Sequence, residues 1–278
     1  MTWDDVAVRN RPPAGSWTPK VVASDLDGTL LRSDLTVSAR ARDALDAAEA
    51  AGVLVVLVTG RPPRWMPPVI EQTGRSGLAI CANGALVIDL ATGATVREHT
   101  LTAADAHKVA EALREAVPEL AFAVEQVGSF GREPAYARPA LAVGDEVVDD
   151  ISELLAAPVA KLLARHPSMA PAELLAVAQQ VVGDLATLTY SSTSGMIEIS
   201  GSGVSKAFAL EHLAADYGAG PQDVLAFGDM PNDLPMLGWA GHGVAVANAH
   251  PDVRAIADEV TAANDDDGVA MVLERIFG

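Results

Sequence analysis

The chain has little of four things: cysteine, aromatic side chains, basic residues and long apolar runs. Its one cysteine, Cys81, excludes an internal disulfide framework and a zinc site built from cysteines, and it fits a reducing compartment. Aromatic residues make up only 4% of the 278 residues, whereas short runs of Val, Leu and Ile recur between Ala-rich stretches. Because such alternation is typical of strands and helices in turn, we expect an α/β fold.

Basic residues are outnumbered, since 19 Lys and Arg stand against 37 Asp and Glu and the formal net charge is −18. Binding to nucleic acid or anionic lipid depends on neutralising phosphates with Lys and Arg, so we expect neither as a partner. An anionic small molecule is compatible with this charge if a metal ion or a few basic residues neutralise it locally. No oligomeric state follows from these numbers.

The longest stretch without a charged residue, residues 234–251, contains two histidines, an asparagine and several glycines, which a membrane-spanning helix disfavours. Residues 1–19 carry charges and prolines in place of the apolar run of a secretory signal. We interpret them as a flexible N-terminal extension. The expectation is a cytoplasmic protein without a membrane partner.

Apolar segments that end in polar residues recur along the chain and indicate buried parallel strands. They cover residues 20–25, 53–58, 78–82, 224–227 and 243–246. Ligands bind where parallel strands of such a sheet end, so the polar residues that follow these segments mark the predicted site.

The pattern changes between residues 86 and 194, where helical stretches mix with short, partly alternating runs. We therefore predict a core domain from residues 20–85 and 195–278, built as a Rossmann-like, doubly wound parallel sheet. Residues 86–194 form an inserted α+β domain in this interpretation. The dipeptide Asn83-Gly84, which stands between two apolar runs, predicts a hairpin.

Asp25 and Asp27 stand two residues apart at the end of the first strand, where a period of two directs both side chains to one face. One carboxylate can attack an electrophile while the other transfers a proton. A solvated turn is the alternative explanation, because Asp and Gly are ordinary turn residues.

Asp229 and Asp233 follow the strand at 224–227 and open a helix. Together with Asp25 they offer the carboxylate oxygens that Mg²⁺ prefers. Helix capping by acidic residues is the alternative, and it explains Asp233 alone well. It does not explain carboxylates at the ends of several buried strands.

Thr59-Gly60-Arg61 ends the second strand and offers a hydroxyl and backbone N–H groups to phosphate oxygens, although Thr ends many strands. Lys206 lies at the start of a predicted helix, where the dipole disfavours a cation. Its charge can balance Asp25 and a transferring phosphate. A solvated surface lysine is the common alternative.

The order of DLDGTL at 25–30, VTGR at 58–61, Lys206 and GDMPND at 228–233 resembles the haloacid dehalogenase superfamily of phosphatases, most closely its Cof-type branch with a large α/β cap. The resemblance spans residues 20–277 and implies an aspartyl-phosphate on Asp25, with Asp27 as acid and base, Thr59 on the phosphate and Lys206 as counter-charge. It implies Mg²⁺ bound by Asp25, the Asp27 carbonyl, Asp229 and Asp233. Gly60, Arg61, Asn83, Gly84 and Asn232 would contact the substrate or its phosphate, and residues 86–194 would be the cap that selects the substrate. One departure from the family pattern is Ala207, where Gly is common.

The predicted function is thus a Mg²⁺-dependent phosphohydrolase that acts on a small phosphorylated metabolite, such as a sugar phosphate or a flavin-pathway phosphate. A phosphomutase or a specialised sugar-phosphate phosphatase on the same core is one alternative. A catalytically silent sensor of a phosphorylated ligand is another. Trp65 and Tyr136 are further residues of interest, and for Trp65 we favour loop packing over a substrate contact.

Overall fold

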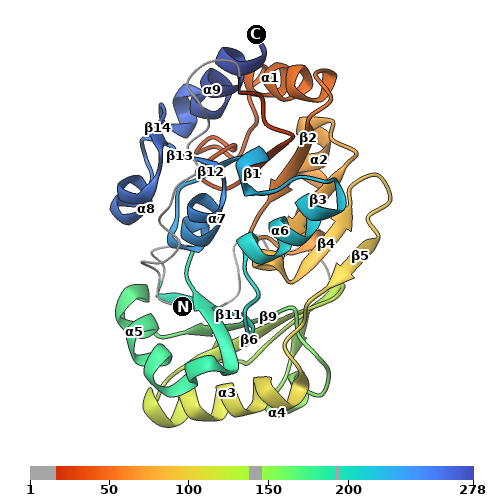
Figure 1. Ribbon diagram of the computed structural model, residues 1–278. Coiled ribbons are helices and arrows are strands. Elements are labelled where there is room, and N and C mark those ends of the chain that lie inside the picture. The colour runs from red at the N-terminus through yellow and green to blue at the C-terminus, as the bar shows by residue number, and fades with distance from the viewer. Residues whose placement is uncertain (1–16, 138–145, 192–194) are drawn as a thin grey trace.

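The computed structural model describes residues 17–137, 146–191 and 195–278. Two lobes lie one above the other in Figure 1, and each is built on its own β-sheet. The larger sheet has eight strands in the order β14-β13-β12-β1-β2-β3-β4-β5, and the smaller has six in the order β10-β11-β9-β6-β7-β8. Most of the predicted N-terminal extension, residues 1–16, lies outside the described residues.

Six neighbouring strands of the larger sheet, from β14 to β3, run parallel, and β4 and β5 continue it antiparallel. The α/β class and the parallel core predicted from the sequence are therefore confirmed. The strands are β1 (Val21–Asp25), β2 (Leu54–Val58), β3 (Leu78–Cys81), β4 (Leu86–Asp89), β5 (Thr95–Glu98), β12 (Val224–Gly228), β13 (His242–Ala245) and β14 (Glu259–Val260).

Helices pack on this sheet through small apolar faces. The first helix begins after Ser38, whose hydroxyl accepts a hydrogen bond from the Ala41 N–H at 2.9 Å. In Figure 1 this helix lies beside the last helix of the chain. The α-helices of the lobe are α1 (Ala39–Ala50), α2 (Pro67–Thr73), α6 (Lys206–Asp216), α7 (Leu234–Trp239), α8 (Pro251–Ile256) and α9 (Gly268–Phe277). Its short 3₁₀ turns are η2 (Pro63–Trp65), η3 (Ala82–Gly84), η5 (Pro221–Asp223), η6 (Pro231–Asp233) and η7 (Asn264–Asp266).

The smaller lobe is an inserted α+β cap, and its sheet has two unlike faces. Leu162 and Ala164, both fully buried, belong to an apolar core that includes residues of α3 and α5. Side chains alternate along a strand, so their neighbours on β9 face the other way. The elements are β6 (Ala121–Gln126), β7 (Ser129–Arg132), β8 (Glu146–Val148), β9 (Lys161–Arg165), β10 (Ala186–Thr189), β11 (Met196–Gly201), α3 (Ala103–Ala116), α4 (Ile151–Leu154), α5 (Pro171–Val182) and η4 (Gly183–Leu185).

Sheet membership differs from the predicted boundaries of the insert at residues 86 and 194. Strands β4 and β5 pair with β3, so residues 86–98 extend the larger sheet. At the other end, β11 pairs with β9 and β10 in the smaller sheet and reaches Gly201. The change of sequence character after residue 85 marks the switch from parallel to antiparallel pairing and not the start of the second sheet. The Asn83-Gly84 hairpin prediction is confirmed by the antiparallel pairing of β3 with β4.

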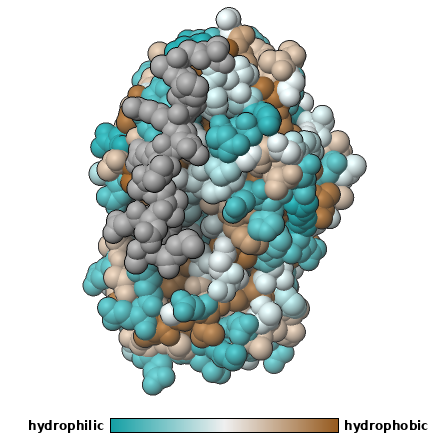
Figure 2. Space-filling view, in the orientation of Figure 1, coloured by the Kyte–Doolittle hydropathy of each residue, from teal (hydrophilic) through white to brown (hydrophobic). Residues whose placement is uncertain are grey.

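The described residues contain no helix that is both long enough and apolar enough to cross a membrane. On the face shown in Figure 2, hydrophilic and hydrophobic side chains are interspersed over both lobes.

Candidate functional site

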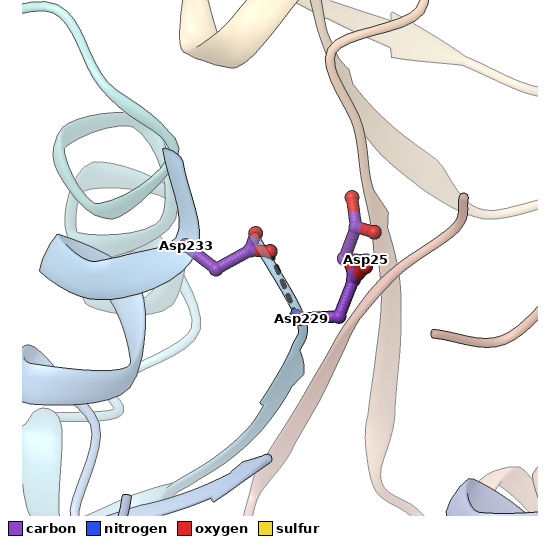
Figure 3. Close-up of side chains that lie close together, drawn as sticks. All are labelled: Asp25, Asp229 and Asp233. Carbon is purple, nitrogen blue, oxygen red and sulfur yellow. Dashed lines mark hydrogen bonds between the residues drawn. The ribbon is translucent and has the colours of Figure 1, made fainter. Parts of the chain in front are cut away.

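Three carboxylates meet at the carboxyl ends of two neighbouring parallel strands. Asp25 is the last residue of β1, and Asp229 follows β12 directly. Asp233 ends η6, the turn that comes next in the chain. One oxygen of each carboxylate lies within 4.8 Å of the others. Figure 3 shows the three side chains close together. All three side chains are buried, so the site gathers negative charge away from water.

Lys206 supplies the positive charge of this cluster. It is the first residue of α6, and its Nζ donates to Oδ1 of Asp25 at 2.5 Å and to Oδ1 of Asp233 at 2.6 Å. Burial alone would lower its pKa, but the two carboxylates outweigh burial and the pKa is raised, so the ammonium stays charged. Its position against the helix dipole serves this ion pair, in line with the charge balance with Asp25 expected from the sequence.

One ammonium does not balance three carboxylates. Burial raises the pKa of Asp25 well above its ordinary value, with the Asp233 and Asp229 charges adding to the rise and Lys206 opposing it. Burial, followed by the Asp233 charge, raises the pKa of Asp229 to about 7. A cation placed among these oxygens would relieve both groups. The Oδ1 atom of Asn232, also buried, has no hydrogen-bond partner among the described residues. An all-oxygen donor set of this kind fits a hard divalent cation such as Mg²⁺.

The loop after β1 is shaped around Asp229. Thr29 Oγ1 donates to Asp229 Oδ1 at 2.9 Å. Gly28 has a φ of +78°, and a Cβ at that position would lie 2.4 Å from Asp229 Oδ2. Asn248 Nδ2 donates to the Gly28 carbonyl at 2.7 Å and fixes the loop from the other side. Thr29 was not predicted as a site residue, although it stands inside the DLDGTL motif at 25–30.

Asp27 lies at the edge of the cluster with its side chain 49% exposed. Arg61 holds it in a two-point ion pair, with Nε 2.7 Å from Oδ2 and Nη2 2.5 Å from Oδ1. The intervening Leu26 is fully buried, so the period of two predicted for this segment places Asp25 and Asp27 on the side of the cavity. Arg61 is only 8% exposed, and it lines the cavity beside Asp27, whose carboxylate it contacts.

The other predicted phosphate and substrate contacts lie deeper. Thr59 is fully buried, and its Oγ1 accepts a hydrogen bond from the Arg61 N–H at 3.0 Å. Gly84 is packed against α6, because a Cβ there would lie 2.2 Å from the Ser205 carbonyl oxygen. Asn83 is 3% exposed and has φ 58° and ψ 29°. Neither Thr59, Asn83 nor Gly84 lines the cavity that contains Asp25.

Asn83 instead belongs to a hydrogen-bonded chain that joins the two lobes. Lys161 Nζ on β9 donates to Glu198 Oε1 on β11 at 2.8 Å and to the Gly60 carbonyl at 2.7 Å. Asn83 Nδ2 donates to Glu198 Oε2 at 2.7 Å, and Asn232 Nδ2 donates to Asn83 Oδ1 at 3.1 Å. A carboxylate only accepts, so Glu198 fixes the orientation of both amides. Sequence reasoning missed Lys161 and Glu198.

Gly60 makes room for this chain, since a Cβ at its position would lie 3.0 Å from Asn83 Oδ1. Burial tends to raise the pKa of Glu198, but the Lys161 charge and the hydrogen bonds prevail and the pKa is lowered. Glu198 therefore stays ionised and keeps accepting from Asn83 and Lys161 at neutral pH.

The cavity between the lobes has a volume of about 340 Å³. Its floor carries Asp25, Asp27, Asp229 and Asn232 from the larger lobe. Its opposite wall comes mainly from the cap and mixes apolar and aromatic side chains with charged ones. The former are Phe130, Tyr136, Leu163 and Met196, with Trp65 from η2, and the latter are Glu125, Lys161, Arg165 and Glu198. Trp65, for which the sequence favoured loop packing, thus lines the cavity. Cys81 takes no part, because burial raises its pKa to about 12 and keeps it a thiol.

Known proteins match this arrangement over nearly the whole chain. The sequence profile of the haloacid dehalogenase-like hydrolases matches residues 22–273. The chain is 28% identical over 273 residues to the 5-amino-6-(5-phospho-D-ribitylamino)uracil phosphatase YitU of Bacillus subtilis, covering 93% of this chain and 98% of YitU. It is 30% identical over 260 residues to YcsE, a phosphatase of the same name and organism, covering 92% and 95%.

Solved structures agree with the sequence matches. BT1666 of Bacteroides thetaiotaomicron, described among phosphatases of the haloalkanoate (HAD) superfamily, superposes with a TM-score of 0.79 at 27% identity, covering 95% of this chain and 97% of BT1666. A family profile that spans most of the chain, phosphatase relatives of matching length and a shared fold lead to one conclusion. The chain belongs to the haloacid dehalogenase-like hydrolase family and is a phosphatase of that family.

Proposed function

We propose that this phosphatase is a Mg²⁺-dependent phosphomonoester hydrolase that forms an aspartyl-phosphate on Asp25. The observation that carries the proposal is the buried Lys206 ammonium, which contacts Asp25 at 2.5 Å while Asp229 and Asp233 lie within 4.8 Å of the same carboxylate. A carboxylate in this setting has both a nucleophilic oxygen and a source of positive charge beside it. That combination is what attack on a phosphate dianion requires.

In the first step, Asp25 attacks phosphorus with a carboxylate oxygen, and the bond from phosphorus to the leaving-group oxygen breaks. Lys206 holds the attacking carboxylate in place and offsets the charge that accumulates on it. Phosphoryl transfer depends on positioning and charge stabilisation, and both are supplied here by buried groups that need little rearrangement.

Asp27 is the proton carrier in the proposal. It gives a proton to the departing oxygen and then takes one from the water that attacks the phosphorus of the aspartyl-phosphate. While Asp27 is ionised, the paired hydrogen bonds from Arg61 keep its carboxylate pointed at the cavity. Its 49% exposure lets it take from solvent the proton that it gives to the departing oxygen, and one of the two hydrogen bonds opens when it is protonated.

Asp25, Asp229 and Asp233 would hold the Mg²⁺ together with the Asp27 carbonyl. When bound, the ion would neutralise phosphate charge next to the nucleophile. The raised pKa of Asp229 and the excess of buried carboxylates support a cation at this place.

The substrate in the proposal is a small phosphorylated metabolite. A net charge of −18 argues against nucleic acid, and a cavity of about 340 Å³ suits a compact molecule. Three relatives are named for 5-amino-6-(5-phospho-D-ribitylamino)uracil, which makes that compound the first to test.

The test is release of inorganic phosphate from this compound and from a panel of sugar phosphates, with Mg²⁺ and with EDTA. The wild type should release phosphate only with Mg²⁺. Asp25→Asn should lose at least about a thousandfold in kcat, because the nucleophile is gone. Asp43→Asn, an exposed change on α1, is the matched control and should behave as the wild type.

Rapid acid quench followed by mass spectrometry should find one added phosphate on the peptide that contains Asp25. Transfer of that phosphate to a second sugar would identify a phosphomutase. Absence of turnover in a folded, Mg²⁺-loaded protein over the whole panel would contradict the proposal and favour the sensor interpretation.

A further inference from the structure

Strand β9 of the cap directs every second side chain into the cavity. Lys161, Leu163 and Arg165 line it, whereas the residues between them belong to the apolar core of the cap. The antiparallel pairing of β9 with β11 places Met196 opposite Arg165 and Glu198 opposite Leu163. Two cations on β9 therefore face the substrate space from the wall opposite Asp25.

These two cations differ in their partners. Lys161 is paired with Glu198 at 2.8 Å. Arg165 has no carboxylate within ion-pair distance among residues 17–137, 146–191 and 195–278, and its Nε is buried without a hydrogen-bond partner. Its neighbours are the Met196 sulfur, 4.0 Å from Nη2, and Tyr136. The centroid of the Tyr136 ring lies 5.2 Å from the guanidinium carbon, and the Tyr136 side chain also forms a hydrogen bond with Arg165.

Neither neighbour neutralises the guanidinium. A thioether accepts hydrogen bonds weakly. Burial raises the pKa of Tyr136 to about 12, so the phenol stays neutral at physiological pH. Acidic residues outnumber basic ones in this chain by 37 to 19. An arginine that lines the cavity without an acidic partner among the described residues is therefore available to bind a ligand.

The surroundings of Arg165 restrict which chemical group of a ligand it can bind. The Arg165 guanidinium carbon lies over the Tyr136 ring, and the apolar residues Phe130, Leu163 and Met196 line the same cavity. A flat guanidinium offers parallel N–H groups to two oxygens or to a ring carbonyl in its plane. Alcohol groups of a simple polyol match this planar fork less well than a carboxylate or a ring carbonyl does.

Resting on the phosphatase function proposed above, we propose that Arg165 forms a second subsite for the leaving group of the substrate. The subsite binds a group with oxygen acceptors in a plane, either a carboxylate or a ring carbonyl, while the phosphate lies at Asp25. Arg165 is thereby a specificity-determining residue at the far end of the cavity.

The test uses two pairs of phosphomonoesters that differ in that group. 6-Phosphogluconate carries a carboxylate where sorbitol 6-phosphate has an alcohol, and uridine 5′-monophosphate carries a ring with carbonyls that ribose 5-phosphate lacks. The wild type should favour the acceptor-bearing member of at least one pair by about tenfold or more in kcat/KM. The pair that shows the preference distinguishes a carboxylate from a ring carbonyl.

Arg165→Met should bring that ratio close to one, and Arg165→Lys should restore it only in part, because an ammonium lacks the planar fork. The matched control is Arg114→Met. Arg114 is a cap arginine that also stacks on an aromatic ring, Phe122 at 4.9 Å, but it is paired with Glu133 and lies outside the cavity lining. This control should keep the wild-type ratio.

A wild type without preference in either pair would overturn the subsite, and so would an unchanged ratio in Arg165→Met. If no compound is hydrolysed, the proposed function fails, and the subsite is judged separately by calorimetric binding of the four compounds to Asp25→Asn. Tighter binding of an acceptor-bearing member, lost in Asp25→Asn/Arg165→Met, would support it. Equal binding of all four would overturn it.

Discussion

At the scale of single residues, the site depends on places where a side chain is absent as well as on the carboxylates. Gly28 and Gly52 both have positive φ, +78° and +82°, but only Gly28 has a neighbour that a Cβ would strike. That neighbour is Asp229, which the cluster needs in one position. A comparison of alanine variants at the two positions therefore distinguishes the effect of backbone strain from the effect of displacing Asp229.

We expect Gly28→Ala to lower phosphatase activity by more than about a hundredfold, because the new Cβ displaces the Asp229 carboxylate from 2.4 Å away. Gly52→Ala should cost about 1 kcal/mol of stability from its positive φ and leave kcat/KM near the wild-type value. Phosphate release and urea denaturation of both variants measure the two effects. Equal activity of the two alanine variants would show that the contact between Gly28 and Asp229 is unimportant.

At the scale of elements, β11 of the cap orients residues of the core through one carboxylate. Glu198 accepts from Asn83 on η3, and Asn83 accepts from Asn232 on η6. Since the carboxylate only accepts, Asn83 must present its oxygen to Asn232. This relation joins three elements that are far apart in the sequence.

We expect Glu198→Gln to lower kcat by about tenfold or more with a smaller change in KM, because Asn83 and Asn232 lose their fixed orientation. A glutamine also leaves Lys161 without its counter-charge. The matched control is Glu133→Gln, which changes a buried cap glutamate paired with Arg114, away from the lobe contact. If both variants lose kcat alike, the effect is a general weakening of the cap.

The sequence predicted those parts of the site that are local. Asp25, Asp27, Asp229 and Asp233 stand in short motifs at strand ends, and the meeting of strand ends follows from parallel pairing. Lys161 and Glu198 could not be predicted in the same way. They lie 37 residues apart and meet only because β9 and β11 pair in one register. A shift of that register by one residue would turn the side chains of one strand to the other face and separate Lys161 from Glu198.

At the scale of the whole molecule, two lobes with separate apolar cores are joined over the cavity by buried polar contacts. Arg64 of η2 pairs with Glu125 of β6, and Asn83 of η3 pairs with Glu198 of β11. Both glutamates are buried, but their pKa values are shifted in opposite directions from the ordinary value of a glutamate. Burial raises the pKa of Glu125 despite Arg64, whereas the Lys161 charge overcomes burial and lowers the pKa of Glu198.

Opposite shifts predict opposite responses to acid. A glutamate with a lowered folded-state pKa contributes stability that is present above its ordinary value of 4.5 and is lost as the pH falls through the folded value. A glutamate with a raised folded-state pKa binds its proton more tightly in the folded state, so its contribution grows as the pH falls. We therefore expect the difference in free energy of unfolding between wild type and Glu198→Gln to shrink as the pH falls below 4.5. The corresponding difference for Glu125→Gln should rise as the pH falls through the raised folded-state pKa of Glu125 toward 4.5, and should level off below that.

Urea denaturation of the three proteins at several values between about pH 7 and about pH 3.5 measures both differences, in EDTA so that metal binding does not contribute. Each variant is the control for the other, because both changes remove one buried negative charge from the same side of the cap sheet. If the difference in free energy of unfolding from the wild type depended on pH in the same way for both variants, the charges of Lys161 and Arg64 would act alike on their partners. Slopes of opposite sign would show that Glu198 is held as an anion by the lobe contact, and that its link to Asn83 persists at any pH where the enzyme remains folded and Glu198 stays ionised.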